Sequence, residues 1–257
     1  MSFSAILVDI GNTSAHAVLA RGGRLSGESR IPTAKLGGAQ GIAWLRRAVR
    51  SAGVGADVVA ASVVPSGTRA LRRACAQLGA RCLVAREDLP IPILNHYARP
   101  RQVGTDRLLN ALAAHRRFRT DCVVIDFGTA ITFDVVSARG VYEGGLIAPG
   151  IEISLDALAA RTALLPRIRL RAPKGLIGRD TVDSIRAGCA YGIAGLCEGV
   201  LRRLRVEWKP RFKVLSTGGY ARFMRGYCPE LGPIDPLLVP KGLLISYREA
   251  KHLSQRG

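Results

Sequence analysis

Two stretches of the chain share a pattern in which an apolar run ends in Asp, then any residue, Gly and polar groups. The first is Asp9-Ile10-Gly11-Asn12-Thr13, and the second is Asp126-Phe127-Gly128-Thr129. In each, the carboxylate would end a buried strand, and the glycine would let the backbone approach a ligand without a Cβ clash. A nucleoside triphosphate with its metal needs these groups, because a carboxylate serves the cation and backbone N–H groups serve phosphate oxygens.

Each copy of this pattern leads into a predicted β-hairpin. Strands at 16–20 and 25–30 follow the first copy, and strands at 131–136 and 141–146 follow the second. A single Asp-x-Gly after a strand is most often an ordinary turn, so the repetition carries the interpretation. Strands alternate with helices along the chain, which indicates an α/β fold. We therefore expect two related halves, each offering a carboxylate-ended strand to a shared cleft.

A third candidate group is Gly104-Thr105-Asp106-Arg107, directly before a predicted helix at 108–118. In the simpler interpretation, Thr105 or Asp106 caps this helix. In the functional interpretation, Asp106 is a base for a hydroxyl proton and Arg107 binds an anion. The neighbouring guanidinium would keep this carboxylate ionised at pH 7. The Pro-rich segment 89–101, which precedes the group, is either a functional loop or a connector.

A long helix is predicted at 182–205, and Thr181 before it is most simply an N-cap. Glycines recur along this helix at spacings of three or four, and they mark a face where another helix can pack closely. That face is either internal or a dimer contact. The glycines are Gly188, Gly192, Gly195 and Gly199.

Composition limits the class of protein. Of 257 residues, 48% are hydrophobic, which excludes bulk disorder. No apolar run approaches the roughly 20 residues of a membrane span, and the N-terminus shows no signal-peptide pattern. The six cysteines show no C-x-x-C spacing, so we expect reduced thiols in a cytoplasmic protein, with neither a disulfide framework nor a zinc site.

The net charge of +19 comes mostly from Arg and is spread over many predicted helices. A nucleic-acid-binding protein would gather such charge on one face. We therefore expect general surface charge without a dedicated nucleic-acid-binding face. This charge still predicts salt-sensitive, nonspecific binding to polyanions.

Taken in order, these motifs resemble the type III pantothenate kinase family. The motifs are Asp9–Thr13, Gly104–Arg107, Asp126–Thr132, Gly144-Gly145 with Pro149-Gly150, Thr181 with Gly188, and Thr217-Gly218-Gly219. This family belongs to the acetate/sugar kinase–Hsp70–actin superfamily. The resemblance therefore implies an α/β fold of two duplicated ribonuclease-H-like lobes with a nucleotide cleft between them. We expect the lobes at 1–118 and 119–257, the second carrying a dimerisation helix.

The resemblance also implies an activity, the ATP-dependent phosphorylation of pantothenate to 4'-phosphopantothenate, which is the first step of coenzyme A biosynthesis. Asp106 would be the general base. Asp126 would hold a monovalent cation, K⁺ or NH₄⁺, and Asp9 would lie near Mg²⁺. The implied ATP-binding residues are Asp9, Ile10, Gly11, Asn12, Thr13, Ser14, Ala15, His16 and Thr129. The implied substrate-binding residues are Tyr97, Gly104, Thr105, Asp106, Arg107 and Thr181.

In this family, Thr181 would reach pantothenate across the interface of a homodimer. One departure lies at residues 14–16, where the family often has a longer or basic residue, so a contact between His16 and ATP is the least supported assignment.

Two alternatives stay open at this stage. One is a nuclease of ribonuclease-H type, in which Asp9, Asp126 and Asp134 gather two metal ions. The other is a catalytically inactive nucleotide- or nucleic-acid-binding regulator of the same fold. The intact acids Asp9, Asp106 and Asp126 favour a working enzyme.

Overall fold

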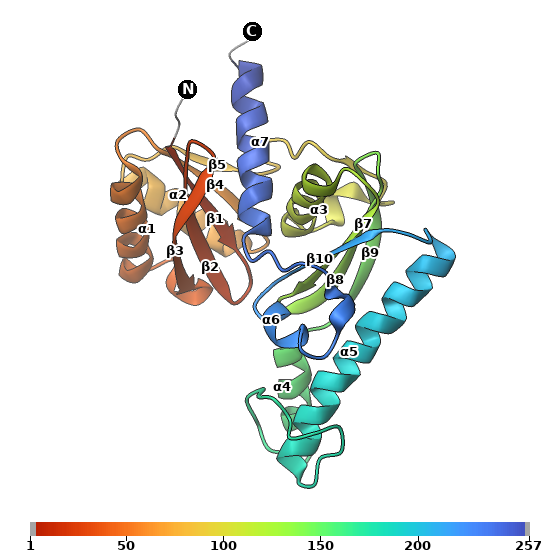
Figure 1. Ribbon diagram of the computed structural model, residues 1–257. Coiled ribbons are helices and arrows are strands. Elements are labelled where there is room, and N and C mark those ends of the chain that lie inside the picture. The colour runs from red at the N-terminus through yellow and green to blue at the C-terminus, as the bar shows by residue number, and fades with distance from the viewer. Residues whose placement is uncertain (1–3, 255–257) are drawn as a thin grey trace. The chain divides into compact units, whose positions relative to one another are not determined.

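The computed structural model describes residues 4–254, which form two compact units (Figure 1). The first unit runs to residue 113 and also includes the C-terminal segment from 237, and the second unit is 114–236. This division differs from the expected lobes 1–118 and 119–257 in the place of the C-terminal segment. Helix α7 (Leu238–Ser254) packs against β1 (Ser4–Ile10) of the first unit, because its apolar residues join the core of that sheet.

The first unit is built on a five-stranded sheet of order β3-β2-β1-β4-β5. Strand β1 pairs antiparallel with β2 and parallel with β4. The alternation of side chains along β1 places Val8 on one face and Leu7 on the other. The remaining elements of this unit are β2 (Ser14–Arg21), β3 (Arg24–Pro32), α1 (Ala39–Ala52), β4 (Asp57–Ser62), α2 (Pro65–Gln77), β5 (Cys82–Val84), the short β6 (Leu94–Asn95) and the 3₁₀ turns Thr33–Lys35 and Pro100–Gln102.

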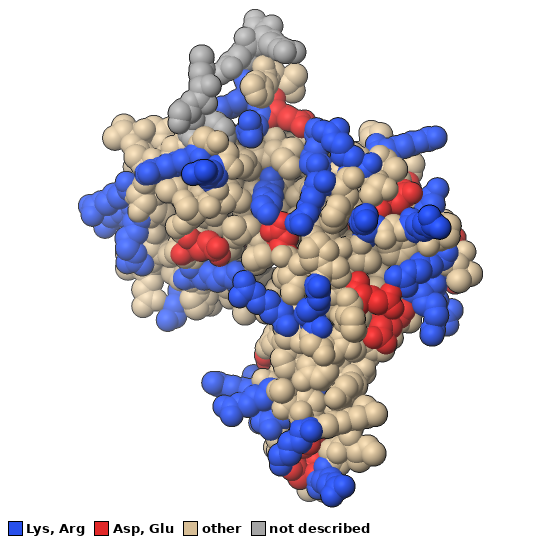
Figure 2. Space-filling model, in the orientation of Figure 1, with Lys and Arg blue, Asp and Glu red and all other residues tan. Residues whose placement is uncertain are grey.

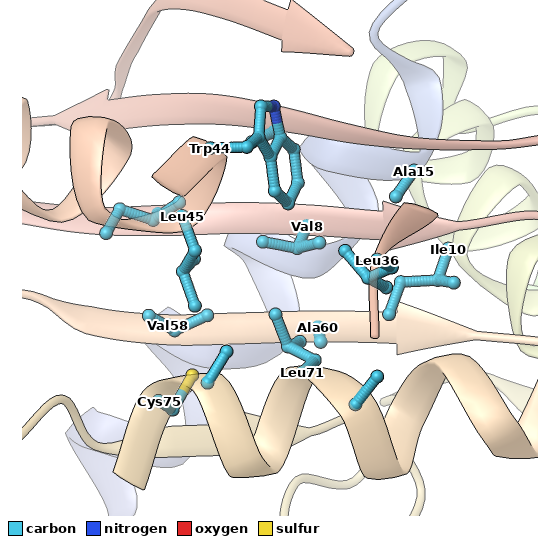
Figure 3. Packing of buried hydrophobic residues seen from close by; sticks show 14 of the residues in the cluster. Val8, Ile10, Ala15, Leu36, Trp44, Leu45, Val58, Ala60, Leu71 and Cys75 are labelled. Atoms are coloured by element: carbon cyan, nitrogen blue, oxygen red, sulfur yellow. The ribbon is translucent and has the colours of Figure 1, made fainter. Parts of the chain in front are cut away.

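Helices cover both faces of this sheet. On one face, Val8 packs with Leu45 of α1 and Leu71 of α2, as Figure 3 shows. On the other face, Leu7 packs with Leu243 of α7 and with Leu109 of helix α3 (Thr105–Phe118). Strand β1, which carries Asp9 next to its last residue, is therefore buried on both sides, and this fixes the position of its carboxyl end.

The second unit repeats this topology. Its strands run in the order β10-β7-β8-β9, which matches the order β4-β1-β2-β3 of the first unit. Again the first strand pairs antiparallel with the second and parallel with the fourth. This repetition confirms the duplicated α/β fold. The elements are β7 (Cys122–Phe127), β8 (Ala130–Val136), β9 (Val141–Pro149), α4 (Ile151–Arg161), α5 (Thr181–Glu207), β10 (Lys213–Thr217), α6 (Ala221–Met224) and the 3₁₀ turn Pro229–Leu231.

Helix α2 begins at Pro65, since proline at the first helical position costs no hydrogen bond. Two element boundaries differ from the sequence expectation. Strand β9 continues through the glycine-rich segment to Pro149, with Gly144 at φ +127° beside a register shift. Helix α5 begins with Thr181 inside the helix, and the residue that caps it is Asp180.

The surface agrees with the composition. No helix among residues 4–254 is long and apolar enough to cross a membrane. All six cysteines are free thiols. On the face shown in Figure 2, the basic side chains are scattered among neutral ones.

Candidate active site

The first loop with the Asp-x-Gly pattern is the turn of the β1–β2 hairpin. The Gly11 N–H donates to the Ser14 carbonyl at 3.0 Å. Thr33 supports the turn from outside, because its Oγ1 donates to the Gly11 carbonyl at 2.7 Å and its N–H to the Thr13 carbonyl at 3.1 Å. Asn12 and Thr13 are exposed at the tip. The turn therefore has a fixed backbone and presents polar groups to solvent.

The predicted ATP-binding residues around this turn fall into two sets. Asp9 is partly buried and the residues at the tip are exposed, whereas Ile10 and Ala15 are fully buried in the core of the first sheet. The side chains of Ile10 and Ala15 thus hold the two strands of the hairpin together, and only their backbone could meet a ligand.

His16 is opposite Asp9 in the β1–β2 pairing and is only 6% exposed. Its Nε2 lies 3.2 Å from Glu28 Oε2. Burial lowers the pKa of His16, and the charge of Arg30 lowers it further, against the opposing effect of Glu28. The imidazole is therefore a neutral group at pH 7 within the sheet, and it brings no positive charge to a phosphate.

The second Asp-x-Gly loop is the turn of the β7–β8 hairpin, and it is one residue shorter than the first. The Gly128 N–H donates to the Ala130 carbonyl at 3.1 Å, and Gly128 and Thr129 are exposed at the tip. Asp126 is partly buried at the end of β7, as Asp9 is at the end of β1. The structure thus places the two acids in equivalent positions of their own units.

Glycines bring two further segments against the second loop. Gly218, at φ +91°, lies so near that a Cβ would be 2.5 Å from Asp126 Oδ1 and 2.5 Å from the Phe127 carbonyl carbon. A Cβ on Gly150 would lie 2.0 Å from the Thr129 carbonyl oxygen. Because no other residue fits at these distances, Gly150 and Gly218 shape the surroundings of Asp126 and Thr129.

Asp106 lies in the first turn of α3, and its carboxylate folds back over Gly104. The Arg107 N–H donates to Asp106 Oδ1 at 2.9 Å, and a Cβ on Gly104 would lie 2.4 Å from the same oxygen. Burial raises the pKa of Asp106, while the backbone N–H and the charge of Arg107 oppose that rise. The sequence analysis took into account only the guanidinium of Arg107, but burial has the larger effect on the pKa of Asp106.

Asp106 and Asp9 lie on the same side of the first sheet, as the core of that unit indicates. Leu7 and Asp9 lie on the same face of β1 because they are two residues apart. Leu109, which follows Asp106 in α3, packs with Leu7 in the core on that face. Helix α3 therefore covers the side of the first sheet that carries Asp9.

The predicted substrate segment is held by hydrogen bonds to side chains. The Tyr97 N–H donates to Asn95 Oδ1 at 2.9 Å. Arg86 donates from Nη2 to the Pro100 carbonyl at 3.1 Å and from Nη1 to the Val103 carbonyl at 2.5 Å. Sequence reasoning missed Arg86, as it missed Thr33, since no local pattern shows that a distant side chain supports a loop.

Thr181 lies in the second unit, exposed at the start of α5. Asp180 caps the helix by accepting from the Asp183 N–H at 2.7 Å, so the capping role expected of Thr181 belongs to its neighbour. Thr181 lines a groove of about 850 Å³ together with residues of α4, of the loop after α4 and of the glycine face of α5.

The acids fit a magnesium ion that phosphates help to hold. Among the described residues, no group of three or more His, Cys, Asp or Glu side chains could hold a metal ion. Mg²⁺ is usually bound through one or two carboxylates plus substrate phosphates, and single acids such as Asp9 suit that arrangement. Asp134, which the nuclease alternative requires, is fully buried and accepts hydroxyl hydrogen bonds from Tyr142 at 3.0 Å and Thr132 at 3.3 Å.

Solved structures define the class of fold. One is a Campylobacter jejuni protein described as a Baf family transcriptional activator, with a TM-score of 0.62, 20% identity, and coverage of 96% of this chain and 99% of that chain. Another is MreB 5 of Spiroplasma citri bound to AMPPNP, with a TM-score of 0.53, 11% identity, and coverage of 99% of both chains. At these identities the similarities show the fold alone, which is an α/β fold shared with MreB 5.

Sequence comparison then identifies the family. The family model for type III pantothenate kinase matches residues 5–203. A type III pantothenate kinase of Nitratidesulfovibrio vulgaris is 40% identical over 262 residues, covering 98% of this chain and 99% of that protein. One of Geobacter sulfurreducens is 36% identical over 249 residues, covering 94% and 97%. The chain belongs to the type III pantothenate kinase family.

Proposed function

We propose that this protein is a kinase that transfers the γ-phosphoryl group of ATP to the primary hydroxyl of pantothenate. Family membership supports this function, and it favours the kinase over an inactive regulator. The observation that carries the proposal is the carboxylate of Asp106, held over Gly104 at the start of α3 beside the Arg107 N–H. A carboxylate fixed in this way suits a general base.

In the proposed reaction, Asp106 accepts the proton of the pantothenate hydroxyl as that oxygen attacks the γ-phosphorus and ADP leaves. Arg107 is the group that binds the pantothenate carboxylate, since a guanidinium matches a carboxylate with two parallel hydrogen bonds. Tyr97, Gly104 and Thr105 complete the substrate-binding segment. Phosphoryl transfer depends on positioning and charge neutralisation more than on covalent chemistry, so one base is enough when backbone groups and bound cations supply the rest.

The residues that the family resemblance assigns to ATP belong to the turn of the β1–β2 hairpin and to the turn of the β7–β8 hairpin. The residues at 9–16 and Thr129 serve the ATP phosphates, through backbone groups where the side chains are buried. Asp9 would hold Mg²⁺, which supplies charge neutralisation at the phosphates when bound. Asp126 would hold K⁺ or NH₄⁺ beside the second turn, where Gly128 and Gly218 both approach its carboxylate closely.

Removal of the Asp126 charge tests the monovalent-cation site. We expect K⁺ or NH₄⁺ to stimulate the wild-type enzyme and Asp126→Asn to lose that stimulation, with roughly a tenfold or larger fall in kcat/KM for ATP. Turnover measured at fixed ionic strength in K⁺ and in a large organic cation checks this. Asp121→Asn is the matched control, because Asp121 lies at the opposite end of the same strand and its Oδ1 accepts from the Ala138 N–H. Equal stimulation of wild type and Asp126→Asn would contradict the assignment.

We also propose a homodimer formed through α5. The buried face of this helix carries Ala187, Ala190 and Ala194. The helical period places Gly188 and Gly192 on the opposite side, where a Cβ added to either glycine would meet no neighbouring segment of residues 4–254 within 4 Å. Glycines on an open helix face let a second helix approach closely, and Thr181 at the start of α5 would then reach the partner's pantothenate.

Filling the glycine face tests the dimer. Gly192→Leu should leave the fold intact, since leucine favours a helix more than glycine does and the position is open. We expect light scattering to show the mass of a monomer where the wild type shows a dimer, and the KM for pantothenate to rise. Gly175→Leu, the same change at another open position, should remain a dimer. A dimeric Gly192→Leu protein would exclude this interface.

A coupled ADP-release assay, run with and without pantothenate, tests the activity itself. The kinase proposal requires ADP release that depends on pantothenate, together with phosphopantothenate as the product. ADP release that ignores pantothenate, or no release at all, would contradict it, and metal-dependent cleavage of a labelled oligonucleotide would favour the nuclease alternative.

A further inference from the structure

The guanidinium of Arg86 joins two points of the segment that leads to Asp106. Its Nη2 donates to the Pro100 carbonyl at 3.1 Å, and its Nη1 donates to the Val103 carbonyl at 2.5 Å. These carbonyls flank the single 3₁₀ turn Pro100–Gln102. Asn95 adds a weaker hydrogen bond, from Nδ2 to the Pro100 carbonyl at 3.4 Å. One side chain from outside the segment therefore fixes both ends of the turn.

The backbone of Arg86 is held in an unusual conformation. Its φ is +72°, in the left-handed region that residues with a Cβ rarely adopt. The Arg86 N–H donates to the Leu89 carbonyl at 2.7 Å, and Ala85 forms a parallel bridge with Leu89, which is buried. A strained residue at a defined place is often functional, because the surrounding structure must maintain it. From this position the side chain reaches the carbonyls of Pro100 and Val103.

The hydrogen bonds of Arg86 also affect the position of the Asp106 carboxylate. Val103 is 2% exposed, so its carbonyl needs a protein partner, and Arg86 supplies one. The peptide between Val103 and Gly104 is thereby fixed. Gly104 in turn accepts from the Leu108 N–H at 3.3 Å as α3 begins, and it lies directly beneath Asp106 Oδ1. The position of the proposed base thus depends on a chain of contacts that starts at Arg86.

We propose that Arg86 is a positioning residue, which sets the substrate-binding segment and Asp106 in place by holding the carbonyls of Pro100 and Val103. It touches neither substrate nor ATP in this role. The inference rests on the proposed function for its kinetic consequence, whereas its structural consequence can be measured without any activity.

Arg86→Asn is the variant that tests this inference, because asparagine tolerates a positive φ and its short side chain lacks the guanidinium that holds the two carbonyls. We expect kcat/KM for pantothenate to fall about tenfold, as loss of two hydrogen bonds predicts, while the KM for ATP stays within about twofold. Arg86→Lys should lie between Arg86→Asn and the wild type, since an ammonium lacks the planar fork that serves two carbonyls. A general loss of structure would instead impair the kinetic constants for pantothenate and for ATP together.

Arg21→Ala is the matched control. Arg21 also donates from its guanidinium to one backbone carbonyl, that of Ser51. It lies at the end of β2 that is remote from the β1–β2 hairpin turn. We expect its kinetics to match the wild type.

Amide hydrogen exchange gives the second readout. In Arg86→Asn, peptides that cover residues 99–107 should exchange faster than in wild type and Arg21→Ala, with the rest of the first unit unchanged. Unaltered exchange in these peptides would overturn the inference whether or not the enzyme acts on pantothenate. Faster exchange with an inactive wild type would instead contradict the proposed function alone. Faster exchange with unchanged kcat/KM in an active enzyme would show that Arg86 stabilises the loop without positioning the base, which also overturns the proposal.

Discussion

Asp106→Asn is expected to lower kcat by about 10²–10⁴-fold, the usual contribution of a general base, and to leave ATP binding nearly unchanged. The amide keeps the size of the side chain and an oxygen to accept from the Arg107 N–H, but it cannot take a proton from the attacking hydroxyl. Steady-state turnover and a separate measurement of ATP affinity check the two parts of this prediction. Asp121→Asn, at the distant end of β7, is the control and should keep wild-type turnover.

The pH dependence of the wild type gives an independent test of the same residue. Burial raises the pKa of Asp106 above the ordinary value of 3.8. A base must be ionised to act, so kcat/KM for pantothenate should fall on the acid side through a pKa higher than that of an exposed Asp. An acid limb at or below the ordinary value, or unchanged turnover of Asp106→Asn, would remove Asp106 from the role of base.

Stability should change in the opposite direction to activity. Because the folded protein binds the Asp106 proton more tightly than the unfolded chain, this group's contribution to stability is present below the ordinary pKa and is lost as the pH rises through the raised pKa. At pH 7 the buried charge therefore opposes folding, and Asp106→Asn removes that charge. We expect its Tm at pH 7 to be equal to or above that of the wild type. A large fall in Tm would mean that the lost activity reflects misfolding.

Much of the fold could be predicted because its signals are local. The strand patterns predicted the hairpins after Asp9 and Asp126, and the helix predicted at 182–205 lies within α5. The repeated Asp-x-Gly pattern predicted the duplication, which the matching strand orders confirm. Each copy of these patterns is complete within one or two elements, so it can be recognised without knowing any contact between distant segments.

The rest could not be predicted because it depends on contacts between segments that are distant in sequence. Helix α7 joins the first unit since Leu243 and Tyr247 pack with β1, which lies near the other end of the chain. His16 follows the first turn closely, yet its contact with Glu28 depends on the β2–β3 pairing. Arg86 belongs to no motif, and only the folded chain places it against Val103.

Gly218→Ala is expected to have the second largest effect, with a loss of about 2–4 kcal/mol of stability and at least a tenfold rise in the KM for ATP. At φ +91° an alanine is strained, and its Cβ would lie 2.5 Å from Asp126 Oδ1 and 2.6 Å from the Phe127 nitrogen. The carboxylate can rotate, but the backbone beside it cannot yield without moving the β7–β8 turn. The loop that we assign to ATP and the monovalent cation would therefore be displaced.

The next residue supplies the control for this prediction. A Cβ on Gly219 would meet no atom of residues 4–254 within 4 Å, and its φ is not positive. Gly219→Ala should therefore stay within about 0.5 kcal/mol of the wild type, as open surface positions do. Thermal unfolding and the KM for each substrate are measured on both variants. They distinguish an effect of the close approach of Gly218 to Asp126 from a general requirement for glycine in this turn. If both variants behave alike, the packing of Gly218 against Asp126 does not shape the ATP site. If only Gly218→Ala raises the KM for ATP, the close approach of Gly218 to Asp126 and Phe127 is required for the ATP site.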